Sequence, residues 1–314
     1  MLRPDDVEEV ARCYGLGAEP RLTGTVERGE QGQVWQLETV VGLWAIKTSF
    51  ELAEEELDGE DAAFQRAAHD AGVPVPVVVL TDVGKVFAKV GDTHVRVYEW
   101  VDIGLPDKRL DPGEVGRLVA AMHRVPFTGR RPEDPWYTEP VGAPAWDRLI
   151  EDLIAEGAPF AADMAAMRDG LVAVESVIEP ARELRTCHRD LWADNLRPTA
   201  SGGMCVIDWE NCGLADPGQE LSGVLFEFWR GERDRARELY REYRRCGGPG
   251  RVDRRGSFSM TVAQLGHITE ISCRAWLDPS EPEEERRRQV GRVAECVDEP
   301  LTLAVIDELL EAVT

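Results

Sequence analysis

The first hundred residues alternate short apolar segments with turn residues, a pattern typical of an antiparallel sheet. Two helices are expected among these strands, at 4–14 and at 51–71, and Pro74 and Pro76 follow the second. That second helix carries Leu57 and Phe64 on one stripe. The strands are predicted at 21–26, 33–39, 40–50, 77–80, 86–90 and 94–100.

The remaining two thirds of the chain is helical in pattern, with one short apolar segment that predicts a strand at 204–207. The helices are predicted at 114–124, 145–156, 159–177, 219–229, 232–245, 257–277, 282–297 and 301–313. We therefore predict an α+β protein in two parts. Residues 1–101 would form a sheet with one main helix, and residues 102–314 a mostly helical lobe.

The strongest chemical signal lies in the stretch 187–213, CHRDLWADNLRPTASGGMCVIDWENCG. It begins with the triplet His188, Arg189 and Asp190, continues to Asn195, and ends its apolar segment at Asp208. Phosphoryl transfer needs an acid that orients and deprotonates an attacking hydroxyl, and oxygen ligands for the metal ions that bridge the phosphates. Asp190 suits the first role, and Asn195 and Asp208 suit the second.

Each piece of this pattern has an ordinary structural explanation when taken alone. Asn195 could cap a helix, and Asp208 could be a turn residue. The complete set at this spacing, with a strand leading into Asp208, favours the catalytic interpretation.

The segments HRDLWADNL and VIDWEN resemble the aminoglycoside phosphotransferase and choline kinase family, the small-molecule relatives of protein kinases. Asp208 is followed by Trp209 and Glu210 instead of the D-F-G of protein kinases, and no A-P-E motif follows. The resemblance implies a bilobal protein-kinase-like fold, with an antiparallel-sheet N-lobe and a mostly helical C-lobe. It also implies ATP or GTP in the cleft, Mg²⁺ on Asn195 and Asp208, and a small-molecule acceptor.

The resemblance further assigns residues that hold the nucleotide. Lys47 ends the segment LWAIK, which resembles the strand whose lysine pairs with the α- and β-phosphates; the alternative is an edge-strand lysine that faces water. Glu60 is the first choice for the acid that pairs with Lys47. Glu56 is the second choice, and Asp61 could also serve.

Two backbone regions complete the expected nucleotide site. Gly29 and Gly32 lie in the first hairpin, where backbone N–H groups could approach the phosphates, although an ordinary hairpin turn explains them equally well. Glu99 and Val101 lie at the expected hinge and are assigned to the adenine edge through their backbone groups.

The charge of the chain bears on the acceptor. With 36 basic and 59 acidic residues the net charge is −23, which disfavours nucleic acid and anionic membranes and favours a cationic substrate. Solubility alone is the competing explanation. The candidate acceptor acids after the catalytic stretch are Glu210, Glu227 and Glu270. A carboxylate-rich pocket would favour an aminoglycoside-type antibiotic, and an aromatic cage would favour choline.

The sequence also predicts where the protein resides. Its seven cysteines form neither a CxxC motif nor a zinc-ligand spacing, which indicates reduced, buried thiols. Neither a signal peptide nor a membrane-spanning stretch is recognisable, so we expect a cytoplasmic protein. A monomer or weak homodimer is expected separately.

Three functions remain open at this point. The first is an ATP-dependent antibiotic kinase, and the second is a metabolic kinase for choline, an amino alcohol or a sugar. The third is a nucleotide-binding module without catalysis, which the presence of all four residues Lys47, Asp190, Asn195 and Asp208 disfavours.

Overall fold

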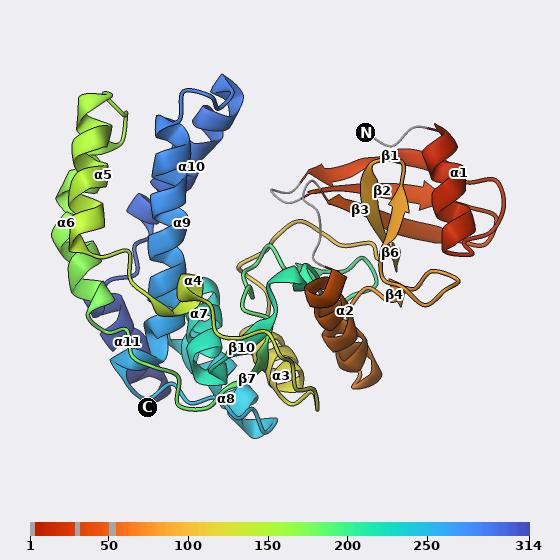
Figure 1. Ribbon diagram of the computed structural model, residues 1–314. Helices are drawn as coiled ribbons and strands as arrows, with labels where there is room; N and C mark the ends of the chain where they lie inside the picture. The colour runs from red at the N-terminus through yellow and green to blue at the C-terminus, as the bar shows by residue number, and fades with distance from the viewer. Residues whose placement is uncertain (1–3, 29–31, 50–54) are drawn as a thin grey trace. The chain divides into compact units, whose positions relative to one another are not determined.

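The computed structural model describes residues 4–28, 32–49 and 55–314. The chain divides into two compact units that interleave along the sequence. Unit 1 consists of residues 1–107, 124–131 and 188–213, and unit 2 of residues 108–123, 132–187 and 214–314. Figure 1 shows the elements of both units.

Unit 1 is built on a six-stranded antiparallel sheet with the order β1-β2-β3-β6-β4, in which β5 also pairs with β6. Helix α1 (Pro4–Cys13) packs against the sheet (Figure 1), and its Val10 lies in one core with Leu37 and Ile46; none of these three residues has exposed surface. The strands are β1 (Arg21–Arg28), β2 (Gly32–Glu38), β3 (Leu43–Ser49), β4 (Val78–Val79), β5 (Ala88–Val90) and β6 (Thr93–Glu99).

Helix α2 (Glu55–Asp70) connects the sheet to the catalytic stretch within unit 1. Its Phe64 ring lies 5.2 Å from the ring of Trp209, in an edge-to-face arrangement, and 5.3 Å from the ring of Phe127. Such aromatic contacts combine a large buried area with a preferred orientation. They hold the short 3₁₀ helix η1 (Trp209–Asn211), which follows Asp208, against α2.

The catalytic stretch forms a hairpin of β8 (Leu196–Pro198) and β9 (Met204–Val206) in unit 1. The backbone N–H of Val206 donates to the carbonyl of Pro74 at 2.9 Å, and the N–H of Gly104 donates to that of Pro198 at 2.6 Å. These bonds tie residues 188–213 to the sheet unit. The predicted division at 101–102 instead assigned them to the helical lobe, because sequence order alone does not show which segments pack together.

Unit 2 is mostly helical, as predicted. Its helices are α3 (Pro112–His123), α4 (Pro135–Thr138), α5 (Ala143–Ala155), α6 (Ala161–Glu175), α7 (Pro217–Trp229), α8 (Arg233–Arg245), η2 (Arg255–Phe258), α9 (Ser259–Leu277), α10 (Glu283–Asp298) and α11 (Leu303–Val313). Strands β7 (Arg185–Cys187) and β10 (Gly213–Ala215) pair with each other and flank the catalytic stretch. The α+β class, with its sheet in the N-terminal part, is confirmed. In the described part of the chain, no helix is long and apolar enough to span a bilayer.

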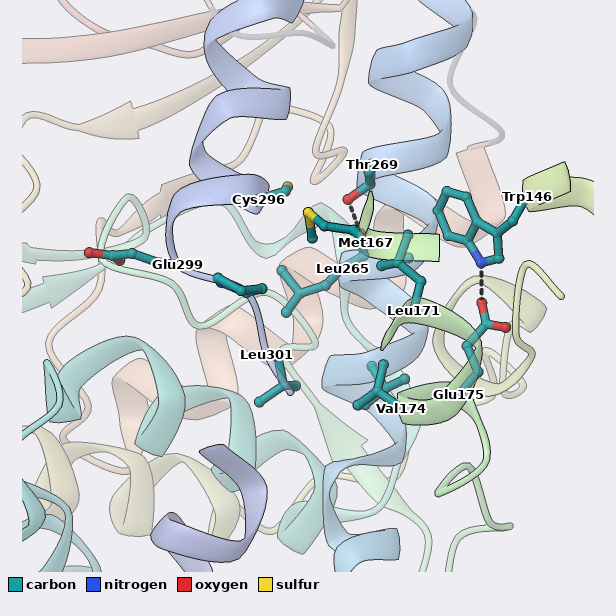
Figure 2. A pocket seen from close by; sticks show the side chains of 13 residues that line it. Trp146, Met167, Leu171, Val174, Glu175, Leu265, Thr269, Cys296, Glu299 and Leu301 are labelled. Carbon is teal, nitrogen blue, oxygen red and sulfur yellow. Dashed lines mark hydrogen bonds between the residues drawn. The ribbon is translucent and has the colours of Figure 1, made fainter. Parts of the chain in front are cut away.

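A small cavity of about 50 Å³ lies among α6, α9 and α10 of unit 2 (Figure 2). Met167, Leu171 and Leu265 are among its largely apolar lining, and Glu175 accepts a hydrogen bond from Trp146 Nε1 at 2.8 Å beside it. A volume of this size holds a few water molecules at most. We therefore interpret it as a packing gap in the helical unit.

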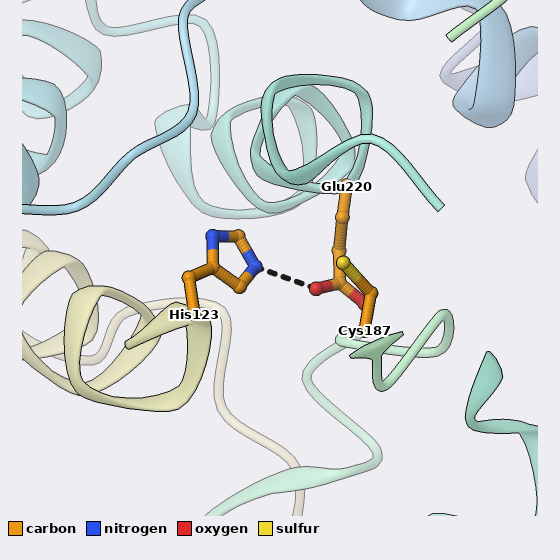
Figure 3. A group of neighbouring side chains, drawn as sticks. All are labelled: His123, Cys187 and Glu220. Atoms are coloured by element: carbon orange, nitrogen blue, oxygen red, sulfur yellow. Dashed lines mark hydrogen bonds and ion pairs between the residues drawn. The ribbon is translucent and has the colours of Figure 1, made fainter. Parts of the chain in front are cut away.

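A buried polar chain links α3, α7 and α8, and Figure 3 shows its contact between His123 and Glu220. His123 Nε2 lies 2.6 Å from Glu220 Oε2, its Nδ1 lies 2.7 Å from Tyr243 Oη, and that hydroxyl accepts from the N–H of Gly250 at 2.7 Å. One proton arrangement satisfies all three bonds: Tyr243 donates to Nδ1 and Nε2–H donates to Glu220. Cys187 is close enough to complete a metal-type trio with His123 and Glu220. Because both ring nitrogens already have partners, we interpret the group as structural.

Candidate active site

Lys47 lies on the face of β3 opposite the apolar core. Ile46 points into the core, and side chains alternate along a strand, so its neighbour Lys47 points the other way. Its Nζ lies 2.9 Å from Asp208 Oδ1 and 2.5 Å from Glu210 Oε2. Burial on its own would lower the pKa of Lys47, but the charges of Glu210 and Asp208 outweigh it, and the pKa is raised. The edge-strand interpretation is therefore wrong: Lys47 is charged and points at the end of the catalytic stretch.

Arg96 lies directly opposite Lys47 on the neighbouring strand β6. Two like charges in such a pair repel each other unless anions lie between them. Glu210 serves both cations, because its Oε1 lies 3.4 Å from Arg96 Nη1. Asp61, on α2, lies 2.9 Å from the same Nη1 atom and has no exposed surface. The result is a network of two cations and three carboxyl groups in unit 1, of which Asp61 is fully buried and Asp208 is half exposed.

The predicted pairing of Glu60 with Lys47 is not the one that the structure shows. Glu60 Oε1 accepts from the backbone N–H groups of Arg130 and Arg131, at 2.6 and 2.9 Å. Successive residues of a helix point about 100° apart. Asp61 therefore faces Arg96, while Glu60 faces the segment 124–131. Glu210 is the acid that pairs with Lys47, and the side chain of Glu56 lies outside the described residues.

Asp190 is partly buried and held by two amides. Asn195 Nδ2 donates to its Oδ2 at 2.9 Å, and Asn211 Nδ2 donates to the same oxygen at 3.2 Å. Burial, followed by the charge of Asp208, raises the pKa of Asp190 to about 7. A carboxyl group tuned to this range can accept a proton near neutral pH and is suited to general base catalysis.

The donor atoms around Asp208 fit a hard divalent cation. Asp208 has left-handed backbone dihedrals, φ 60° and ψ 68°, and its side chain is 44% exposed. Burial opposes its ionisation, but a hydrogen bond with Glu210 and the charge of Lys47 lower the pKa of Asp208, so it is an anion. Asn195 uses its amide nitrogen to bind Asp190, which leaves the amide oxygen as a neutral ligand. Oxygen donors of this kind are those that Mg²⁺ prefers.

Four further residues of this site escaped sequence reasoning: Asn211, Arg96, Arg131 and Arg189. Asn211 lies three residues after Asp208 on η1, and its contact with Asp190 depends on that turn. Arg131 donates from Nη1 to the carbonyl oxygens of Glu210 and Cys212. Any residue type can offer a backbone carbonyl, so the roles of Arg131 and Arg189, which bind such carbonyls, could not be predicted from the sequence. Arg96 binds side chains that are far away in sequence, Asp61 and Glu210.

The predicted phosphate and adenine contacts rest on backbone positions. Gly29 lies outside the described residues, and Gly32 is the first residue of β2. The N–H of Glu99 donates to the carbonyl of Val77 at 2.9 Å, so Glu99 could meet an adenine only through its own carbonyl. Val101 follows the end of β6. These contacts remain predictions.

The acids proposed for the acceptor already have cationic partners. Glu210 lies against Lys47 and Arg96 and is 17% exposed, so its role at the acceptor stays a prediction. In unit 2, Glu227 Oε2 lies 3.2 Å from Lys108 Nζ. Glu270 Oε1 lies 2.8 Å from Arg274 Nη2. An acceptor amine would have to compete with these partners.

The sequence model of the phosphotransferase enzyme family matches residues 25–255, which is most of the chain. The chain therefore belongs to this family and is a small-molecule kinase. The match includes Lys47, Asp190, Asn195 and Asp208. No curated protein matches the sequence significantly.

Solved structures of similar fold act on different small molecules. A spectinomycin phosphotransferase bound to ADP and spectinomycin has a TM-score of 0.71 at 14% identity, covering 99% of this chain and 98% of its own. A microcompartment-associated aminopropanol kinase has a TM-score of 0.61 at 18% identity, covering 98% of both chains. The choline kinase LicA from Streptococcus pneumoniae has a TM-score of 0.55 at 17% identity, covering 92% of this chain and 97% of its own. At these identities the likeness establishes the kinase-like fold and leaves the acceptor open.

Proposed function

We propose that this kinase transfers the γ-phosphoryl group of ATP to a hydroxyl group of a small, cationic molecule of the aminoglycoside type. The observation that supports this most is the joint placement of the reactive groups. Lys47 contacts Asp208, and Asp190 is held by Asn195 and Asn211, all within unit 1.

Each of these side chains has a separate task. Asp190 orients the acceptor hydroxyl and receives its proton as the new P–O bond forms. Lys47 holds the nucleotide phosphates, with Glu210 and Asp208 fixing the direction of its ammonium group. Asn195 and Asp208 would hold Mg²⁺, which when bound neutralises charge on the phosphates. Because phosphoryl transfer is mainly positioning and charge stabilisation, this set is sufficient.

A second candidate is a metabolic kinase for an amino alcohol, choline or a sugar. The ion pairs of Glu227 with Lys108 and of Glu270 with Arg274 favour it, because they leave less negative charge for a polycation. The kinases for aminopropanol and choline share the fold at similar identity.

A screen of ADP release would test the proposal. Wild type and Asp190→Asn would be incubated with ATP or GTP, Mg²⁺ and one acceptor at a time, drawn from aminoglycosides, other antibiotics, amino alcohols and sugars. We expect acceptor-dependent ADP release from wild type only, highest with a cationic antibiotic. If an amino alcohol or sugar is best, the second candidate holds. Tight nucleotide binding without turnover on any acceptor would indicate a nucleotide-binding module and contradict both candidates.

A further inference from the structure

The residue before Asp190 has an unusual backbone conformation. Arg189 has φ 65°, in the left-handed region that side chains other than glycine rarely adopt. It is also 5% exposed, although arginine is seldom buried unless its donors are satisfied. A strained backbone and a buried guanidinium at one residue indicate that the surrounding structure holds it in place.

The Arg189 guanidinium binds the segment that carries Asp208. Its Nε donates to the carbonyl of Asn211 at 2.6 Å, and its Nη2 donates to the carbonyl of Cys212 at 3.3 Å. In turn, the side chain of Asn211 donates a hydrogen bond to the carboxylate of Asp190. Two hydrogen bonds thus link residue 211 to the catalytic loop: Arg189 donates to its carbonyl, and its side chain donates to Asp190. Movement of the segment 208–213 would move the donor that holds Asp190.

Gly213 provides the space for this guanidinium. A Cβ atom at position 213 would lie 2.5 Å from Arg189 Cζ and 2.6 Å from its Nη2, far inside van der Waals contact. Any side chain at 213 would therefore displace the guanidinium or the backbone. Arg131 donates to two carbonyls of the same segment, those of Glu210 and Cys212.

We infer that Arg189 is a positioning residue that clamps the metal-binding segment 208–213 to the catalytic loop, and that Gly213 is the slot in which its guanidinium sits. The inference rests on the proposed function, in which Asp208 holds Mg²⁺ and Asp190 is the base. Arg189 touches neither the nucleotide nor the acceptor in this account. It acts by holding Asp208 and Asn211 at fixed positions relative to Asp190.

A double-mutant cycle tests the clamp and its slot together. The variants are Arg189→Gly, Gly213→Ala and the double substitution. Glycine fits the left-handed conformation at 189, so Arg189→Gly removes the guanidinium without adding strain. Arg230→Gly is the matched control: Arg230 also has a positive φ, of 54°, and it is exposed in unit 2.

Two readouts need no acceptor. The first is hydrogen exchange of the amides of 207–213 by mass spectrometry, and the second is the Mg²⁺ concentration at half-maximal binding of a non-hydrolysable ATP analogue. Each single substitution should speed exchange in this segment and raise the required Mg²⁺ by about tenfold, the effect of losing a charge-assisted hydrogen bond. The double variant should match Arg189→Gly within about twofold, because an empty slot tolerates a methyl group. Arg230→Gly should match wild type.

The clamp is overturned if Gly213→Ala has the same effect with and without the guanidinium, or if Arg189→Gly leaves exchange and Mg²⁺ dependence unchanged. If wild type binds no nucleotide, the proposed function fails, and the exchange cycle still decides the clamp. If circular dichroism shows that Arg189→Gly does not fold, the cycle is run with Arg189→Lys. That variant keeps the charge but lacks the planar guanidinium that a Cβ atom at 213 would meet, so Gly213→Ala should cost less in it than in wild type.

Discussion

Asn211 offers a sensitive test of how Asp190 is held. Its Nδ2 atom donates to Asp190 Oδ2 at 3.2 Å, alongside the shorter bond of 2.9 Å from Asn195. Asn211→Ala would remove one of these two donors and leave Asp190 and Asn195 in place. The substitution changes neither the proposed base nor a proposed metal ligand.

The size of the effect follows from the bond that is lost. A hydrogen bond to a charged group contributes about 1.5–3 kcal/mol, which corresponds to about 10- to 150-fold in a rate. The Asn211 bond is at the long end of the range for N–H···O, and Asn195 still holds the same oxygen, so we expect the lower end. Turnover should fall by about tenfold, while the KM for ATP should change by less than about threefold, because the bond orients the base rather than the nucleotide.

The pH dependence gives a second, independent readout of this substitution. The pKa of Asp190 is raised to about 7 by burial and by Asp208, and the bond from Asn211 opposes this rise. The carboxylate form is active, so kcat/KM should be full above about pH 7 and be lost as the pH falls through it. Without Asn211 the pKa rises further, and the loss should begin at a higher pH.

Steady-state ADP release between pH 5.5 and 8.5 measures both effects. In an Asp190→Asn background, Asn211→Ala should have almost no additional effect, because the carboxylate on which Asn211 acts is gone. If Asn211→Ala lowers turnover equally in the two backgrounds, or if the pH at which kcat/KM is lost does not change, Asn211 does not support Asp190.

Three further predictions concern the metal, the acceptor and the helical unit. Asp208→Ala should abolish most of the Mg²⁺ dependence of nucleotide binding in calorimetry, and a dependence equal to that of wild type would remove Asp208 from the metal site. The KM of a cationic acceptor should rise with salt and in Glu270→Gln, because the acceptor is bound through charge attraction, which salt screens over about 8 Å. A KM that changes with neither salt nor the substitution would favour the metabolic candidate. Tyr243→Phe leaves two buried groups without a partner and should cost about 2–4 kcal/mol of unfolding free energy in urea. Tyr240→Phe, on the same helix, loses only a 3.5 Å contact and should cost under about 0.5 kcal/mol; equal losses in the two variants would contradict the structural role of Tyr243.

The elements of the fold could be predicted from the sequence because their patterns are local. The apolar alternation predicted the strand that carries Lys47, and the helical period predicted α2 and the longer helices of unit 2. The order of the catalytic residues was also visible, because Asp190, Asn195 and Asp208 lie within 19 residues, on one hairpin and its flanks.

The partners of these residues depend on tertiary structure. The choice of Glu60 for Lys47 failed because one residue of difference on a helix rotates a side chain by about 100°. Asp61 then serves Arg96, and Glu210, which is distant in sequence, serves Lys47. The charge count suggested that Glu227 and Glu270 were free for an acceptor, but it could not show that Lys108 and Arg274 already pair with them.

The central claim is that Asp190 is the base in a phosphoryl transfer to a hydroxyl group. The most direct measurement is ³¹P NMR of the product formed from ATP and the best acceptor of the screen, with wild type and Asp190→Asn compared at equal nucleotide occupancy. The account predicts a phosphate monoester on the acceptor with wild type. It also predicts that Asp190→Asn binds ATP as tightly but forms the ester at least about a hundredfold more slowly, because the carboxylate acts mainly in the transition state. Ester formation by Asp190→Asn at nearly the wild-type rate would contradict the account.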